Sequence, residues 1–377
     1  PAAGFGDLDT AVAVPDTPFV PQDRYQCGPA ALQTVLQGSG ADVSLPWLVD
    51  RVYVPGRQGS FQVEVVAAAR AAGRIPYRVD ASLEAVGREL AADRAVLVLQ
   101  NLGVAWYPRW HFAVVYALDP SRGIVSLRSG TDRERHSKAD VFLRTWARAD
   151  FWGIVVMRPD ELPARPDRDR WFTAVADFER SGRASDASVA WRTAARQWPD
   201  EPMPWFGLGN VAYATGAPGA AEGYYRRALA LDPDYAMARN NLAWVLADLG
   251  RVDEALQELD LALAAPDLPP ALQEEIRDSR RQISDRGTVD ARFVCGDGLP
   301  ALVTFTGSET VRLRLPDGDR ILARERSASG ERYAGDGLVF WNKGDEALLD
   351  VGGVAHHCVR DPAADASRPG SETRGRP

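Results

Sequence analysis

Residues 22–32 read Gln-Asp-Arg-Tyr-Gln-Cys-Gly-Pro-Ala-Ala-Leu, and this stretch decides how the first third of the chain is interpreted. The small and apolar residues that follow Cys27 predict a helix from Pro29 to Gln37, because proline is favoured in a first helical turn. Cys27 would then lie at the positive end of the helix dipole, where we expect the pKa of its thiol to be lowered. The stretch therefore predicts a nucleophilic cysteine.

His111 is the candidate base for this thiol. It opens the apolar run 112–116, and it stands apart from the other three histidines, since His136 lies in a charged run and His356-His357 lie far along the chain. An imidazole can pair with a thiolate and later protonate a leaving amine. Gln22 and the Cys27 backbone N–H are the expected oxyanion donors. The alternative is an inert buried thiol and a core histidine.

The pattern around these residues predicts an α+β domain over residues 21–160. Amphipathic helices are expected at 61–72 and 83–91, and short apolar strands at 94–100, 112–118, 124–127 and 151–157. Helices followed by strands with hairpin-length turns are typical of α+β folds. Residues 1–20 are rich in Pro, Ala and Asp without a period, and we expect a leader or linker there.

Residues 22–129 resemble the bacteriocin-type double-glycine leader peptidases, which are papain-like cysteine peptidases. The resemblance implies hydrolysis of a peptide or protein substrate without a cofactor, and it carries over Gln22, Cys27 and His111 as catalytic residues. The family's Asp after the His strand falls where this chain has Ser129. Asp119 and Asp132 are the alternatives for orienting the imidazole.

A second region repeats with a period of about 34 residues. It follows the proline-rich stretch 159–169, an expected linker, and Gly182, Gly216 and Gly250 recur at that spacing. The pattern resembles the tetratricopeptide repeat and implies an all-α superhelix over residues 161–288. Such arrays expose a concave groove, so we expect a protein partner there. The alternative is a spacer or dimerisation element.

Residues 289–360 predict a small antiparallel β-barrel or sandwich, since short alternating segments are separated by Gly and Asp turns. Cys295 and Cys358 bracket this region. We expect them to form a disulfide worth about 4 kcal/mol, leaving Cys27 as a free thiol. The alternative is three reduced cysteines in a cytosolic protein. Residues 361–377 are polar, and we expect them to be disordered.

The segments 327–333 and 340–347 resemble the MliC inhibitors of c-type lysozyme. The resemblance implies that Ser329 and Lys343 enter the lysozyme cleft, where a hydroxyl and an ammonium can bind its paired carboxylates. The alternative is a structural domain in which Lys343 only occupies a turn. His356 and His357 point to opposite faces of an expected strand and have no evident third ligand, so no metal site is expected.

The composition excludes several classes of function. The net charge of -8, without a basic stretch, argues against nucleic-acid binding. No apolar run approaches the roughly 20 residues of a membrane span, and no phosphate-binding loop is present. Because the sequence starts at Pro1, we expect a removed signal peptide or lipidated leader, and so a periplasmic or envelope-associated protein.

Two functions follow from these features. The leading hypothesis is an extracytoplasmic cysteine peptidase with partner-binding repeats and a lysozyme-inhibitor-like module. The alternative is a non-catalytic envelope protein that binds partners through its repeats and inhibits c-type lysozyme.

Overall fold

The computed structural model describes residues 4–22, 26–57, 59–104, 106–286, 288–306, 310–327 and 330–361. The chain divides into two compact units, Pro1–Ala217 and Pro218–Pro377, and each is described by itself. Within the described residues, the longest helices are too short or too polar to cross a bilayer. Ser329 and the expected tail beyond Asp361 lie outside the described residues.

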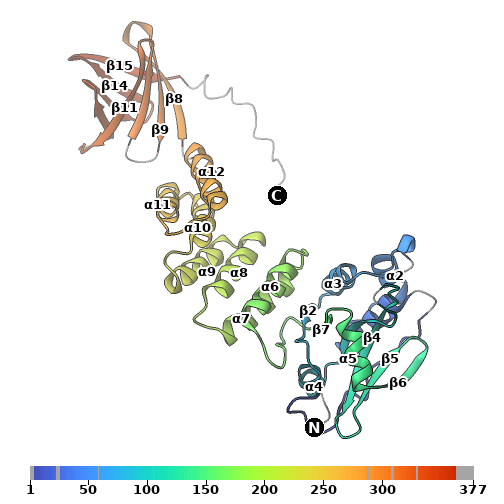
Figure 1. Ribbon diagram of the computed structural model, residues 1–377. Helices are drawn as coiled ribbons and strands as arrows, with labels where there is room; N and C mark the ends of the chain where they lie inside the picture. Colours follow the sequence, from blue (N-terminus) through green and yellow to red (C-terminus); the bar gives the residue numbers. More distant parts are fainter. Residues whose placement is uncertain are drawn as a thin grey trace. The chain divides into compact units, whose positions relative to one another are not determined.

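The first unit is built on a mixed helix and sheet domain (Figure 1). Its elements, in chain order, are β1 (Val12–Ala13), α1 (Cys27–Gly38), α2 (Leu45–Val52), η1 (Pro55–Arg57), α3 (Gln62–Ala71), β2 (Ile75–Arg78), α4 (Leu83–Ala91), β3 (Val96–Asn101), β4 (Trp110–Asp119), β5 (Ile124–Ser129), β6 (Asp132–Lys138), α5 (Ala139–Ala147) and β7 (Gly153–Met157). The strands form one antiparallel sheet in the order β2-β7-β3-β4-β5-β6, and β1 pairs with β4.

The sheet is covered on both faces. Leu32 and Leu36 of α1 pack with Phe112 and Val114 of β4 in one buried cluster, to which α2 and α3 also contribute. Val115 points to the opposite face by strand alternation and is fully buried, and α4 and α5 contact the strands there. Burial on both faces explains why β3 and β4 are nearly continuous apolar runs.

The first twenty residues differ from the expected leader or linker. Phe5 is fully buried, and β1 adds to the sheet through the pairs Val12–Leu118 and Ala13–Ala117. The guanidinium of Arg128 donates to the carbonyl of Thr17 at 3.2 Å and stacks over a tyrosine ring of β4. A two-residue strand carries too short a pattern to be found in sequence, so the docking of this segment depends on its tertiary contacts.

The segment that leads from β7 to the first helix of the helical region is hydrogen-bonded to this domain. The expected linker 159–169 is held in place, because Ala164 N–H donates to the Glu89 carboxylate at 2.9 Å and Asp167 N–H donates to the Tyr77 hydroxyl at 3.1 Å. The helices are α6 (Arg168–Glu179), α7 (Ala184–Gln197) and α8 (Pro202–Ala214) in the first unit, and α9 (Pro218–Leu231), α10 (Ala236–Asp248), α11 (Val252–Leu263) and α12 (Pro270–Arg286) in the second.

The repeated glycines lie where the turns require them. Gly182, Gly216 and Gly250 have φ angles of +84°, +80° and +79°, in the left-handed region that ends helices. The sequence period therefore predicted both the helix pairs and the residues that separate them.

The last part of the chain is a closed antiparallel barrel, so the expected barrel is confirmed over the alternative of a sandwich. Its strands are β8 (Thr288–Cys295), β9 (Leu299–Thr306), β10 (Thr310–Leu315), β11 (Gly318–Glu325), β12 (Glu331–Gly335), β13 (Leu338–Lys343), β14 (Glu346–Val351) and β15 (Val354–Arg360), with η2 (Gly296–Gly298) after β8. Cys295 and Cys358 are paired across β8 and β15 and form the expected disulfide, and Cys27 is free.

Candidate functional site

Cys27 is the first residue of α1, and Pro29 lies in the first turn, where a missing backbone N–H is tolerated. The packing of α1 against β4 places the sulfur within hydrogen-bonding reach of the backbone at Phe112, the residue after His111. The backbone N–H groups of Gly28 and Cys27 also favour the thiolate. The first turn of α1 and the beginning of β4 thus meet at the thiol.

The predicted lowering of the thiol pKa was wrong in direction. Burial raises the pKa of Cys27 above its ordinary value, and the three backbone hydrogen bonds, at Phe112, Gly28 and Cys27 itself, only partly oppose this effect. A helix N-terminus favours a thiolate, but desolvation of the charged sulfur outweighs it here.

His111 lies near the start of β4, opposite Gln100 of β3, and its ring is held by Ser129. The distance between His111 Nε2 and Ser129 Oγ is 2.8 Å, and Ser129 is only 5% exposed at the end of β5. Burial, together with the positive charge of Arg135, lowers the pKa of His111 to about 4. The imidazole is therefore neutral at physiological pH.

Neither alternative aspartate holds the ring. Asp119 lies at the other end of β4, roughly 26 Å away at about 3.3 Å per residue, and its carboxylate accepts from Ser121 Oγ and Arg122 N. Those hydrogen bonds lower the pKa of Asp119. Asp132 lines the same recess as His111, but no hydrogen bond joins the two side chains in the described part of the chain. Ser129 is the residue that the fold brings to the imidazole.

Gln22 reaches the same recess, which has a volume of about 330 Å³ and is also lined by His111, Ser129 and Leu102. The Gln22 backbone N–H donates to the carbonyl of Gly130 at 3.3 Å, which fixes this part of the N-terminal segment beside the β5–β6 turn. Gln22, His111 and Ser129 therefore line one recess at the adjoining ends of β4 and β5, while Cys27 packs beside Phe112, the next residue along β4. Within the described residues, Cys27 and His111 are not joined by a direct hydrogen bond.

An exposed aromatic hairpin lies beside this recess. Between β3 and β4, Val104, Trp106 and Tyr107 are 43%, 86% and 66% exposed, and Trp110 at the start of β4 is 54% exposed. The base of the hairpin is rigid, because the buried Asn101 side chain accepts from the backbone N–H groups of Gly103 and Arg109, both at 2.9 Å.

Two further groups, one beside the thiol and one beside His111, had no signal in the sequence. Ser60 packs against Gly28, where a Cβ would stand 2.4 Å from Ser60 Oγ. That hydroxyl is buried and makes no hydrogen bond in the described structure. Arg135 affects His111 only because β6 pairs with β5. Both effects depend on segments that meet only in the folded chain.

The candidate inhibitory residues are described in part. Lys343 is the last residue of β13, at a tight turn, and it lies opposite Glu346 in the register of β13 with β14. The His357 ring lies 3.9 Å from the Glu346 carboxylate, which is an ion pair only when the imidazole is protonated. No group of three or more possible metal ligands occurs among the residues that the structure covers.

Comparison with protein families matches two parts of the chain. Residues 168–273 match the tetratricopeptide repeat, and residues 293–357 match the membrane-bound lysozyme-inhibitor of c-type lysozyme family, MliC. The helical region is therefore a tetratricopeptide-repeat region, as predicted, and the barrel is an MliC domain. Residues 21–160 have no family match, so their papain-like character stays a prediction.

Solved structures resemble about a third of the chain. They include the type III secretion translocator chaperone SycD of Yersinia enterocolitica, with 19% identity, 30% of this chain and 81% of that chain covered, and a TM-score of 0.29. PcrH of Pseudomonas aeruginosa has 17% identity, 31% and 90% coverage and a TM-score of 0.29. The P58(IPK) TPR domain has 20% identity, 32% and 33% coverage and a TM-score of 0.29. No curated protein matches the chain.

Proposed function

We propose that this protein is an extracytoplasmic cysteine peptidase in which Cys27 is the nucleophile and His111 transfers the proton. The observation that carries the proposal is the hydrogen bond between His111 Nε2 and Ser129 Oγ at 2.8 Å. It fixes the ring through one nitrogen, so we assign Nδ1 to the thiol, whose sulfur lies within hydrogen-bonding reach of the backbone at the next residue, Phe112. A nucleophile, a base and a group that orients the base are the three parts of such a site.

The proton transfer follows from the two pKa shifts. Because burial raises the pKa of Cys27 and lowers that of His111 to about 4, the resting pair is a neutral thiol and a neutral imidazole. His111 takes the thiol proton as sulfur attacks the carbonyl carbon, and it returns that proton to the leaving amine. Water then hydrolyses the thioester, with His111 again accepting a proton.

Two groups support this reaction without exchanging protons. The Gln22 amide and the Cys27 backbone N–H are the oxyanion donors, a role in which a single donor contributes about 10²–10³ to the rate in other enzymes. Ser129 is a positioning residue, since it acts through the imidazole. It stabilises the imidazolium less than a carboxylate would, so we expect a slower enzyme than one with an acidic partner.

The aromatic hairpin is the proposed wall of the substrate groove. Leu102 belongs both to its base and to the recess that holds His111. Large apolar side chains that a rigid hairpin holds in solvent mark an interaction surface. We assign it to a polypeptide substrate, with the repeats recruiting that substrate or a protein partner.

Peptide hydrolysis and thiol labelling test the proposal together. The full chain should cleave a protein substrate such as unfolded casein, and Cys27→Ala should abolish the cleavage. Cys27→Ser is the matched variant, because it keeps the shape of the site but offers a weaker nucleophile. Equal cleavage by all three proteins would show a contaminating protease. If the wild type is inactive and iodoacetamide labels Cys27 equally fast in the wild type and in His111→Gln, the peptidase proposal fails.

A second function is favoured by the match of residues 293–357 to the lysozyme-inhibitor family. In this alternative, the protein lacks catalysis, binds partners through its repeats and inhibits a c-type lysozyme in the cell envelope. The Cys295–Cys358 disulfide supports an oxidising compartment for either function. Ser329 and Lys343 are the proposed inhibitory residues.

The two lysines of the chain provide the test and its control. Lys343→Ala should raise the inhibition constant for hen egg-white lysozyme at least about 10-fold, the effect of one lost charge-assisted hydrogen bond. Lys138→Ala, on β6, should leave the constant unchanged. If the intact protein does not inhibit the lysozyme, the inhibitor function is refuted. If both variants inhibit it equally, Lys343 has no part in the inhibition.

A further inference from the structure

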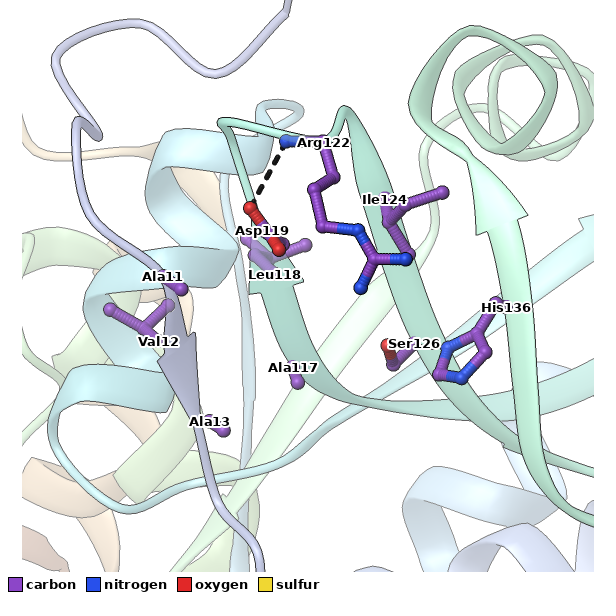
Figure 2. Close-up of a pocket in the computed structure, with 10 residues that line it drawn as sticks. All are labelled: Ala11, Val12, Ala13, Ala117, Leu118, Asp119, Arg122, Ile124, Ser126 and His136. Carbon is purple, nitrogen blue, oxygen red and sulfur yellow. Dashed lines mark hydrogen bonds between the residues drawn. The ribbon is translucent and has the colours of Figure 1, made fainter.

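A second recess lies on the sheet away from Cys27 and His111. Strand pairing aligns Ala13, Ala117, Ser126 and His136 across β1, β4, β5 and β6. Three of these four neighbouring side chains are very small, so this row does not fill the space above the sheet. A trough of about 320 Å³ results, and Figure 2 shows the residues that line it.

Hydrogen-bonding groups from two strands and a turn converge in this trough. Ser126 is 7% exposed, and its Oγ lies 2.9 Å from His136 Nδ1. The Arg122 side chain extends from the β4–β5 turn into the same space, as Figure 2 shows. With Ser126 hydrogen-bonded at Nδ1, the Nε2 of His136 remains for a ligand. When Ser126 Oγ donates to Nδ1, the neutral ring carries its hydrogen on Nε2, so that in this tautomer Arg122 and His136 offer two donors to one volume.

The charges around the trough favour an anion. The guanidinium of Arg122 forms no ion pair within the described residues, although Asp119 lines the same trough. One carboxylate oxygen of Asp119 is used by its own turn, since Oδ1 accepts from Ser121 Oγ and from Arg122 N. On β6, Glu134 and Lys138 share the face of His136 by strand alternation and offset each other, so Arg122 is the cation that the lining itself supplies.

The remaining lining is apolar. Val12, Leu118 and Ile124 border the space around the two alanines. A ligand that fits must therefore combine an anionic head with a small apolar body, as pockets for small molecules generally combine apolar walls with a few polar groups. Planar two-oxygen anions match the forked donors of arginine.

We propose that this trough binds a small organic carboxylate. Its two oxygens accept from the Arg122 guanidinium and from His136 Nε2, and its apolar body lies over Ala13 and Ala117. The carboxylate comes either from a free acid or from the C-terminus of a short peptide, which share this chemistry. Because the site does not include Cys27 or His111, it stands whether or not the chain is a peptidase.

The four histidines make the test direct. In the full-length protein, the imidazole resonances are followed by NMR during titration with benzoate up to about 20 mM, a range that captures millimolar affinity. His136→Gln identifies the His136 signal. Benzoate should shift that signal saturably and leave the His111, His356 and His357 signals in place, while the neutral isostere benzamide should shift none. N-acetylphenylalanine and its C-terminal amide repeat the comparison for a peptide-like acid.

Three variants distinguish the proposed site from general anion binding. Arg122→Gln should weaken benzoate about 10-fold or more, since it removes a charged donor. Asp119→Asn keeps the acceptor oxygen of the turn and removes a like charge, so it should tighten binding by about 2- to 5-fold. Arg133→Gln, on the exposed strand β6, is the matched control and should change nothing.

The outcomes separate cleanly. Tighter binding of N-acetylphenylalanine than of benzoate marks a peptide C-terminus as the source, and tighter binding of benzoate marks a free acid; both support the site. An unsaturable shift, an equal response to benzamide, or an equal loss in Arg133→Gln and Arg122→Gln would overturn it. If Ala117→Leu, which fills the floor, folds normally and still binds benzoate with wild-type affinity, the ligand does not occupy this trough.

Discussion

Replacing Ser129 with aspartate tests whether His111 and Cys27 act as one unit. Ser129 Oγ now lies 2.8 Å from Nε2. Aspartate would place its Cγ near that position and its carboxylate oxygens about one bond length beyond, so a small shift of the side chain brings an oxygen into contact with the ring. An opposite charge in such contact raises the pKa of a histidine by about 1–3, which would bring His111 from about 4 to roughly 5–7. The imidazolium that forms when the thiol loses its proton then becomes more stable.

The size of the effect follows from the proton equilibrium between the two groups. The fraction of thiolate–imidazolium pair rises tenfold for each unit by which the pKa of His111 increases, as long as that fraction is small. A rise of about two units therefore predicts roughly 100-fold more of this ion pair. Alkylation of Cys27 by iodoacetamide at pH 7 should become faster by at most this factor, because thiolate that has lost its proton to water also reacts in the wild type. Labelling is easily assigned, since the other two cysteines form a disulfide.

The assay is the pH profile of alkylation, measured on the wild type, Ser129→Asp, Ser129→Asn and Ser129→Ala. The wild type should follow one alkaline ionisation, because burial raises the pKa of its thiol. Ser129→Asp should gain a reactive thiolate near neutral pH. Ser129→Asn matches aspartate in size without its charge, so it should not. Superimposable profiles for folded Asp and Asn variants would refute the coupling of Cys27 with His111.

Three other predictions concern stability. The pKa of His111 lies at about 4 in the folded chain and at 6.5 when unperturbed. Between these two pH values the unfolded chain therefore binds more protons than the folded chain. The free energy of unfolding should fall by up to about 3 kcal/mol as the pH drops from 6.5 to 4. Urea titrations of His111→Gln should lack this component, and an unchanged pH slope would contradict it. Gly207→Ala places a Cβ 2.2 Å from the Trp191 indole and should destabilise the packing of α7 against α8 by about 1–3 kcal/mol. Gly223→Ala is the control, because a Cβ at this position on α9 meets open space. Amide hydrogen exchange measures both variants, and equal protection in the two would exclude the clash. Reducing the Cys295–Cys358 bridge, which spans 63 residues, should lower the stability of the barrel by about 4 kcal/mol and speed amide exchange in β8 and β15; unaltered exchange under reductant would rule this out.

Much of the fold could be predicted where its pattern is local. The repeat glycines occupy left-handed turns, and the alternating segments between Cys295 and Cys358 are strands of one barrel. Segments without a long period were missed. These include β1, which has two residues, and the edge strand β6, whose charged run around His136 has no apolar alternation. Their positions come from pairing with β4 and β5.

The candidate site divides in the same way. Cys27, His111 and Gln22 carry chemistry in their residue types, so they could be selected from the sequence. The choice between Ser129, Asp119 and Asp132 could not be made there, because it depends on the register of β4 and β5 and on which strand end faces the ring. The trough around Arg122 had no sequence signal at all, since its residues become neighbours only across four strands.

By itself, the sequence determined the three kinds of region, the disulfide partners and the residues able to act as nucleophile and base, because each is encoded in a period or in the identity of a few side chains. The tertiary structure decided that Ser129 holds the imidazole and that the thiol is harder to ionise than its helix position suggests. Strand register and burial are properties of contacts between distant segments, and desolvation of Cys27 outweighs the local effect of the helix dipole.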